Sequence, residues 1–596
     1  MPPPSDFSFA PQPARAERQR QEGRARHRLV VSAIMAALLT ACGGGGGGGG
    51  TGGSVGGADA AGPSTASQGV TTLSAACSAC GAVDDRTYAG AGTGVWQVSN
   101  TSGAAADFPV AIDGLQGQSV TLVFTNETES AVAMPSLQVL ADTTSVLPSA
   151  TLLAKTSLPQ ATNTASGVLH DQMDARDRSA IDAFNRSGFE QHLNTAPAPA
   201  RHTQLSALKA VVTYGVGQQR TVYLSDQSQR TVQLARQRLA GDGTTINVWV
   251  ETSELRADRV SDALVSRIDN AFGGAGGVYD MLLKVGGPLW GPHSQASLID
   301  GSGQPIDLFF VNFDHNAQPY GLGGYFWALN NFRKGSSGLL AQSNESIGMF
   351  MDTETMYLDG EQGLKQVVTA LAHEGTHMQN FYRRGVLLGA QYTFDTWLEE
   401  MTAMMMEDWA SYALDPSHNA IRDVRFPYYL SWRNTGSYNC SLIDWTPMGA
   451  DCESYAVNGS FGGYLNRQFG LGFYESLLRN TGETDSVAML DKAIRAQRAD
   501  SGLGKELRQF ASASAGLVPL SSGVAPYSMP ARSDDGLHLV AVDPHAIGES
   551  MRRLPQSVPA ELKGLASLPV SRSRRVGTYA ETVRVPPGTT LTVVVN

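Results

Sequence analysis

The pattern of apolar and polar positions divides the chain into three stretches. From 77 to 160, short β-prone runs such as "GVWQVSN", "FPVAID" and "SVTLVFTN" are separated by Gly, Asn and Asp, a pattern typical of strands and turns. From 208 to 514, strands are followed by a block of helices, and from 523 onward loops and β-prone runs return. Strands followed by helices predict an α+β central part, flanked by small β-rich domains.

The central stretch contains two kinds of strand and a series of helices. The runs "TVYLSD" and "TTINVWVET" predict strands, and 258–272 is an amphipathic helix. The apolar runs 306–314 and 346–353 are bounded by turns, which predicts buried strands. A polar helical segment and the linker-like "TAPAPARH" precede this part. We therefore expect a β-sandwich-like domain at 76–165, a helical and linker segment at 166–206, the α+β domain at 207–518 and a β-rich domain at 519–596.

The segment 363–385 predicts a long helix with two unlike faces. One face carries an apolar stripe, formed by Leu364, Val367, Val368, Leu371 and Met378. His373 and His377, one turn apart, point to the opposite face at about 100° per residue. Basic residues suit the last turn of the helix, and Gly385 stands where a C-terminal capping glycine belongs.

The N-terminal residues predict export. A basic flank, the apolar stretch 29–41 and a small-residue end indicate a signal peptide over 1–41, too short to span a membrane. "LTAC" resembles a bacterial lipobox, which implies a lipid on Cys42. The alternative is a cysteine that ends an ordinary signal peptide. The glycine-rich 42–75 predicts a flexible tether. We expect an exported protein, anchored by lipid in the cell envelope at the outer membrane or released outside the cell.

Charge and cysteine content narrow the picture further. The formal net charge of -11 argues against a nucleic-acid partner. Besides Cys42, the chain has Cys77 and Cys80 three apart and Cys440 and Cys452 twelve apart. In an exported protein these two pairs predict two local disulfides. The alternative for the first pair is half of a zinc ribbon, but a second C-x-x-C is missing.

The stretch "LAHEGTHMQN" in the predicted helix matches the pattern H-E-x-x-H. His373 and His377 are spaced to share one metal ion, and Glu374 stands between them. The alternative is a solvated helix face. A catalytic zinc takes a third protein ligand, and the helix "TFDTWLEEMTAMMMEDWASYAL" at 393–414 offers carboxylates.

"AHEGTHMQNF" followed by "WLEEMTA" resembles the gluzincin zinc peptidases and is most similar to the hyicolysin-type family of secreted bacterial neutral metallopeptidases. "SNESIGMFMD" at 343–352 adds to the likeness, which covers roughly 209–481. The resemblance implies a thermolysin-like catalytic domain and makes Glu400 the third ligand. Glu399, where the family often has Asn, is expected to cap the helix or face solvent.

One position departs from the family pattern. Many gluzincins have Asp four residues after the ligand Glu, to orient a histidine; here that residue is Met404. Glu407, seven residues after Glu400 and on the same helix face, is the candidate for this role. The alternative is that Glu407 is an exposed acid.

These residues together predict peptide hydrolysis with one zinc ion per chain. Glu374 would accept a proton from water as general base and return it to the leaving amine. By resemblance, Tyr455 in "CESYAVNGSFGG" would stabilise the oxyanion, with Tyr464 and Tyr382 as rivals and His418 as a second donor. The expected substrates are proteins or peptides.

Two other functions remain open at this point. The first is an aminopeptidase of related fold, although "GMFMD" at 348–352 lacks the Glu of the G-x-M-E-N stretch found in such enzymes. The second is a non-catalytic surface lipoprotein that keeps the peptidase fold.

Overall fold

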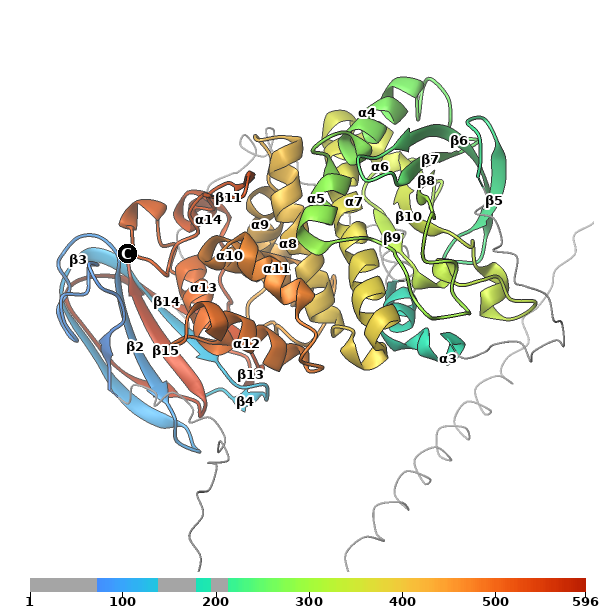
Figure 1. Ribbon diagram of the computed structural model, residues 1–596. Helices are drawn as coiled ribbons and strands as arrows, with labels where there is room; N and C mark the ends of the chain where they lie inside the picture. The colour runs from blue at the N-terminus through green and yellow to red at the C-terminus, as the bar shows by residue number, and fades with distance from the viewer. Residues whose placement is uncertain (1–71, 138–177, 194–212) are drawn as a thin grey trace, which may run out of the picture. The chain divides into compact units, whose positions relative to one another are not determined.

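The computed structural model describes residues 72–137, 178–193 and 213–596 (Figure 1). The predicted signal peptide, Cys42, nearly all of the tether and the linker at 195–202 lie outside these residues. Within the described ranges, none of the helices combines the length and the apolar character that crossing a membrane requires.

Both ends of the described chain contribute strands to one sheet of five, in the order β1-β2-β15-β3-β14. The strands are β1 (Ser74–Ala75), β2 (Gly94–Asn100), β3 (Ala106–Asn126), β14 (Ala566–Val585) and β15 (Thr589–Val595). Every neighbouring pair is antiparallel, and β15 lies between β2 and β3. Figure 1 shows the blue and red strands side by side. The structure thus differs from the expectation of two separate flanking domains at 76–165 and 519–596.

The two faces of this sheet are buried against different partners. Trp96 and Val98 of β2 belong to the core of the β part, whereas Val95 belongs to a smaller cluster. That cluster also contains Ala513 of helix α13 (Leu503–Ala515) and Tyr527, so it joins the sheet to the helical part. The alternation follows from the two-residue period of a strand.

Strand β3 is longer than the sequence pattern indicates. The runs 108–113 and 119–126 predict two strands, but both lie in the single strand β3. Gly114 has φ of 90°, and a Cβ atom there would lie 2.5 Å from the carbonyl oxygen of Tyr88. Only glycine fits this position, so the chain can continue as a strand past it. Beside the large sheet, β4 (Val132–Ala133) pairs with β13 (Glu561–Leu562).

A second sheet of six strands has the order β5-β6-β7-β8-β10-β9. Its strands are β5 (Gln219–Tyr223), β6 (Gln229–Leu239), β7 (Thr245–Glu251), β8 (Ile306–Val311), β9 (Gly324–Phe326) and β10 (Ile347–Asp352). Strands β7, β8 and β10 are parallel, and the other pairings are antiparallel. Strand β9 is therefore an edge strand beside β10.

The parallel strands are buried along their whole length, which explains their continuous apolar runs. Strand β8 carries a buried carboxylate, Asp307. Asp307 in β8 accepts hydrogen bonds from Asn247 Nδ2 (2.8 Å) and Trp249 Nε1 (2.9 Å). A buried polar group is tolerated when its hydrogen bonds are satisfied, and Asp307 meets that condition.

Helices make up most of the chain after the second sheet. The main helices are α4 (Asp262–Gly273), α5 (Val278–Gly286), α6 (Thr353–Leu358), α7 (Gly360–Asn380), α8 (Thr396–Leu414), α9 (Phe426–Ser431), α10 (Ser454–Phe469), α11 (Leu471–Arg479), α12 (Ser486–Gln497), α13 (Leu503–Ala515) and α14 (Pro544–Met551). Helix α7 packs against α8, α5, β9 and β10. It therefore lies between the sheet edge and the rest of the helices.

Helix α7 does not end at Gly385 as its sequence indicates. The chain continues as a π-helical turn over Phe381–Val386, and Gly385 lies inside it. The glycine that ends the helix is Gly389, with φ of 111° and its N–H directed to the carbonyl oxygens of Arg384 and Gly385. The local sequence offers two candidate glycines, and the packing of the extra turn selects the later one.

Two further segments pack on the central part from outside its expected limits of 207 and 518. The short strands β11 (Arg532–Asp534) and β12 (Leu537–Leu539) follow residue 518, yet β12 packs against α8 and α14 against α9. Before residue 207, residues 178–183 are helical and lead into a π-helical turn at Phe184–Gly188 and helix α3 (Glu190–Leu193). This second segment lies against the site described next.

Candidate metal centre

Helices α7 and α8 bring together His373, His377 and Glu400. The Nε2 atoms of His373 and His377 lie 3.1 and 3.8 Å from Oε2 of Glu400. Each residue offers one ligand atom, and the three atoms all lie within 4.8 Å of one another. His373 and Glu400 are buried, and only 12% of the His377 side chain is exposed.

The arrangement fits a tetrahedral metal ion. Ligand atoms about 2.1 Å from zinc in tetrahedral directions lie about 3.4 Å from one another. The two Nε2–Oε2 distances fall on either side of that value. Two imidazoles and one carboxylate are also a donor set that zinc accepts at catalytic sites, where a fourth position stays open.

In each histidine, the ring nitrogen Nδ1 contacts a carboxylate other than Glu400. Nδ1 of His373 lies 2.7 Å from Oε1 of Glu407, and Nδ1 of His377 lies 2.8 Å from Oε1 of Glu399. A carboxylate on Nδ1 fixes the imidazole orientation and directs the lone pair of Nε2 toward the ion. Both imidazoles are thus set to use Nε2 as the ligand atom.

Glu407 lies where the sequence places a second partner for a ligand histidine. It is buried and also accepts hydrogen bonds from Nη2 of Arg425 at 3.0 and 3.2 Å. Burial raises the pKa of Glu407, but the charge of Arg425 and the hydrogen bond to His373 outweigh it and lower the pKa to about 2. Glu407 is therefore an ionised group, not an exposed acid.

Glu399 differs from its expected role. It neither caps helix α8 nor points freely into solvent, since only 24% of its side chain is exposed. Besides His377, it accepts hydrogen bonds from Nδ2 of Asn380 at 3.1 and 3.2 Å. The adjacent residues Glu399 and Glu400 of α8 therefore contact the two different ring nitrogens of His377, Glu399 at Nδ1 and Glu400 at Nε2.

The carboxylates also change how the two histidines bind protons. Burial lowers the pKa of each imidazole, but hydrogen bonds and negative charges outweigh it. The contacts with Glu400 and Glu407 raise the pKa of His373 to about 10, and Glu399 and Glu400 raise that of His377 to about 9. Because a ligand imidazole must be neutral, metal binding at this site is expected to release protons.

Glu374 lies on α7 between the two histidines but faces the sheet edge. It is buried, and Oε2 accepts a hydrogen bond from the backbone N–H of Phe326 in β9 at 2.8 Å. It is not one of the three grouped ligand residues. The edge strand thus holds one carboxylate oxygen of Glu374 and sets the direction of the other.

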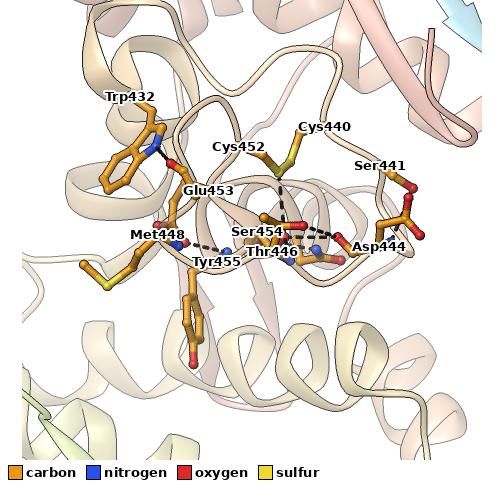
Figure 2. The surroundings of a disulfide bond; sticks show 12 residues. Trp432, Cys440, Ser441, Asp444, Thr446, Met448, Cys452, Glu453, Ser454 and Tyr455 are labelled. Carbon is orange, nitrogen blue, oxygen red and sulfur yellow. Dashed lines mark hydrogen bonds between the residues drawn. A yellow bond between two sulfur atoms is a disulfide. The ribbon is translucent and has the colours of Figure 1, made fainter. Parts of the chain in front are cut away.

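Tyr455 lies at the start of α10, just after the Cys440–Cys452 disulfide. Glu453 caps this helix by accepting from the backbone N–H of Tyr455 at 3.0 Å. Figure 2 shows the tyrosine side chain directed away from the disulfide. Burial raises the pKa of Tyr455, and the charge of Glu400 raises it further, so the hydroxyl keeps its proton.

The structure places the rival candidates in other contacts. The hydroxyl of Tyr464 is buried and lies 2.9 Å from Oε2 of Glu506, and that of Tyr382 donates to the carbonyl oxygen of Pro292. Nδ1 of His418 lies 3.3 Å from Asp423. Among these, Tyr455 is the residue whose pKa responds to the charge of Glu400.

Both expected cysteine pairs are bonded in the structure. Cys440 and Cys452 have Cα atoms 5.3 Å apart, and Cys77 and Cys80 have Cα atoms 6.0 Å apart. The Cys440–Cys452 disulfide closes the loop that leads into α10 (Figure 2). It therefore restrains the chain that positions Tyr455.

Sequence reasoning missed several residues of the site. Arg425 and Asn380 contact Glu407 and Glu399, and Arg178 donates from Nη1 to the Tyr455 hydroxyl at 3.3 Å. Asn380 lies three residues after His377 on the same helix, a spacing that could have suggested it. No local signal points to Arg178 or Arg425, because tertiary packing alone brings them to the site.

A buried pair of imidazoles with a carboxylate between two helices defines a candidate metal-dependent hydrolase. The family model described as Peptidase M30 matches residues 226–596, and the chain belongs to this family. A second model, described as a domain of unknown function, matches residues 75–139.

A curated relative points the same way. The chain is 25% identical to "Neutral metalloprotease ShpI" of Staphylococcus hyicus over 262 residues, which is 43% of this chain and 53% of the relative. The chain thus spans about half the length of that relative. Together with the family, this likeness supports a metallopeptidase role, and the expectation of the hyicolysin-type family is confirmed at that level.

Proposed function

We propose that the protein is a zinc-dependent endopeptidase in which His373, His377 and Glu400 hold the ion and Glu374 is the general base. The observation that carries the proposal is the convergence of the three ligand atoms within 4.8 Å, with Glu374 beside them on α7. The expected stoichiometry is one zinc ion per chain, and the expected substrates are proteins and peptides.

Glu374 is placed to move protons at the reacting atoms. Bound zinc supplies a Lewis acid, which lowers the pKa of water and polarises a carbonyl oxygen. The Phe326 amide holds Oε2 of Glu374, so Oε1 is the oxygen that takes the proton from the attacking water. The same carboxyl group then gives that proton to the nitrogen of the leaving amine.

Tyr455 is the proposed donor to the oxyanion of the tetrahedral intermediate. Its protonated hydroxyl can donate a hydrogen bond. Arg425, which contacts Glu407, lies over the Tyr455 ring at 5.3 Å from its centroid, and Glu407 in turn contacts His373. The capping carboxylate of Glu453 and the Cys440–Cys452 disulfide hold the start of α10 that carries it.

The proposal also covers the fold type of the catalytic domain and the cellular location of the protein. We propose a gluzincin-type catalytic domain, based on the order H-E-x-x-H then Glu in two successive long helices. Export and a lipid anchor on Cys42 are supported by the N-terminal sequence alone.

The test compares wild type with Glu374→Gln, using cleavage of an unfolded protein substrate and zinc content as readouts. The variant should keep about one zinc per chain and lose about a thousandfold or more of its activity, because glutamine cannot act as a base. Glu361→Gln, at an exposed position near the start of the same helix, is the matched control and should change neither readout. Full activity in a zinc-loaded Glu374→Gln variant would refute the mechanism. Zinc binding without any peptidase activity in wild type would favour the non-catalytic lipoprotein.

A further inference from the structure

Residues 178–193 pack across the candidate active site. Phe184 contacts the rings of Trp327 and Phe332, and Phe189 lies edge-on to Phe381, at 5.0 Å between ring centroids. The turn Phe184–Gly188 packs against the turn Phe381–Val386 that continues α7, and Figure 1 shows the segment in teal near the end of that yellow helix. Side-chain hydroxyls of Thr393 and Ser297 donate to its backbone carbonyls. The segment is therefore docked by specific contacts along its length.

The segment occupies the free side of the edge strand β9. Nδ2 of Asn185 donates to the carbonyl oxygen of Phe326 at 2.9 Å, and Oδ1 accepts from the N–H of Ala328 at 2.8 Å. One side-chain amide thus forms the donor and acceptor pair that the backbone of an added strand would form. Free backbone groups on a sheet edge are where an extended peptide pairs. Phe326 is also the residue whose N–H holds Glu374.

The same face of the segment reaches the reacting groups. Arg178 and Asp182 are one helical turn apart, and Arg178 donates to the Tyr455 hydroxyl that is proposed to serve the oxyanion. Burial raises the pKa of Asp182, and the charges of Glu400 and Glu374 raise it further. Two side chains of one segment thus contact the proposed oxyanion donor and the edge strand.

The segment lies outside the part of the chain that defines the family. The Peptidase M30 match begins at residue 226, and the match to the other domain ends at 139. Residues 178–193 fall between the two, so they are not shared parts of the family match, although they contact its site. The segment supplies none of the three proposed metal ligands, yet it packs across their site. This is the geometry of an inhibitor.

We propose that residues 178–193 are an internal inhibitory segment, which keeps the enzyme latent by occupying the substrate position along β9 through Asn185 and the proposed oxyanion donor through Arg178. The inference rests on the proposed peptidase function. It implies that activity appears when the segment leaves the site.

The experiment measures kcat/KM for an unfolded protein substrate with the purified full chain and its Arg178→Ala/Asn185→Ala variant. Loss of the two Asn185 hydrogen bonds alone corresponds to about a tenfold change in the population of the open site. The variant should therefore gain about tenfold or more, with unchanged zinc content and thermal midpoint. Glu190→Ala removes an exposed carboxylate from the same segment and should leave kcat/KM unchanged.

A synthetic peptide with the sequence of residues 178–193 provides a second readout. It should inhibit the activated double variant, and a peptide with alanine at positions 178 and 185 should inhibit it at least tenfold less. Equal activity of wild type and a folded, zinc-loaded double variant would overturn the inhibitory role and leave the proposed function intact. No activity in any folded, zinc-loaded form would overturn the proposed function and this inference with it. Activity that persists when Glu374→Gln is added to the double variant would also overturn the proposed function.

Discussion

Nδ1 of His377 lies 2.8 Å from Oε1 of Glu399, one residue before the proposed ligand Glu400. Partners of this kind support metal affinity through the orientation and basicity of the imidazole. Glu399→Ala should therefore weaken zinc binding by about 10- to 100-fold, and Glu399→Gln, which keeps an acceptor without the charge, by less. Competition with a chromophoric chelator measures the affinity. Equal affinities for wild type and both variants would show that the contact between Glu399 and His377 does not support zinc binding.

Zinc should stabilise the folded chain through the three proposed ligands. An ion present at 100 times its dissociation constant stabilises the native state by about 2.7 kcal/mol. Removal of zinc with a chelator should lower the thermal midpoint of wild type, and added zinc should restore it. Glu400→Ala should show little of this difference, whereas Glu361→Ala on the exposed start of α7 should behave as wild type. A zinc-dependent shift of normal size in Glu400→Ala would remove Glu400 from the site.

The fully buried ion pair between Arg467 of α10 and Asp408 of α8 should be a large determinant of stability. Nη1 of Arg467 lies 2.7 Å from Oδ2 of Asp408, and neither side chain is exposed. Arg467→Met leaves a buried carboxylate without its cation and should lower the free energy of unfolding by about 3–5 kcal/mol. Adding Asp408→Asn should recover part of that loss.

The exposed pair Arg584–Asp107 provides the control for this measurement. Both side chains are about half exposed, at 53% and 55%, so Arg584→Met should change the free energy of unfolding by less than about 1 kcal/mol. Denaturant unfolding measures both variants. Similar small losses for Arg467→Met and Arg584→Met would mean that α8 and α10 are held together by apolar contacts alone.

Asp352 should make the fold less stable as the pH rises. Burial raises its pKa to about 6 from an ordinary value of 3.8, against the hydrogen bonds from Thr355 that lower it. Between these two values the unfolded chain loses the proton and the folded chain keeps it, so rising pH favours unfolding; below pH 4 the penalty vanishes.

Asp352→Asn tests this penalty without removing the helix cap. Asparagine can still accept from the backbone N–H of Thr355, now 2.7 Å from Oδ2. The variant should be more stable than wild type by about 2 kcal/mol at pH 8 and equal to it near pH 4. A difference between the two proteins that does not change with pH would point to packing rather than ionisation.

The local parts of the site follow from the sequence, because helix periodicity sets them. A spacing of four residues puts His373 and His377 on one face, and a spacing of seven puts Glu407 on the face of Glu400. The structure brings these four side chains together. Glu399 could not be assigned in the same way, since its role depends on the angle at which α7 and α8 cross.

Contacts distant in sequence could not be predicted from local pattern. Arg178 reaches Tyr455 across 277 positions, and no periodicity connects them. The five-stranded sheet, which combines strands from both ends of the described chain, is a second example. The pattern of each strand alone does not show which other strand it pairs with. Such pairings depend on which surfaces are free after the central part has folded.

That sheet has a consequence for biosynthesis. Ser99 of β2 contacts Thr590 of β15, which is 491 positions later and leaves the ribosome long afterwards. Until β15 is made, β2 and β3 lack the strand that lies between them, and Trp96 and Val98 cannot complete their core. The strands β2 and β3 must therefore remain without β15, bound to a chaperone or still extended, while the residues between β3 and β15 are synthesised. A premature stop before the last strands would release a chain whose helices α7 and α8 are complete but whose first strands remain open to aggregation.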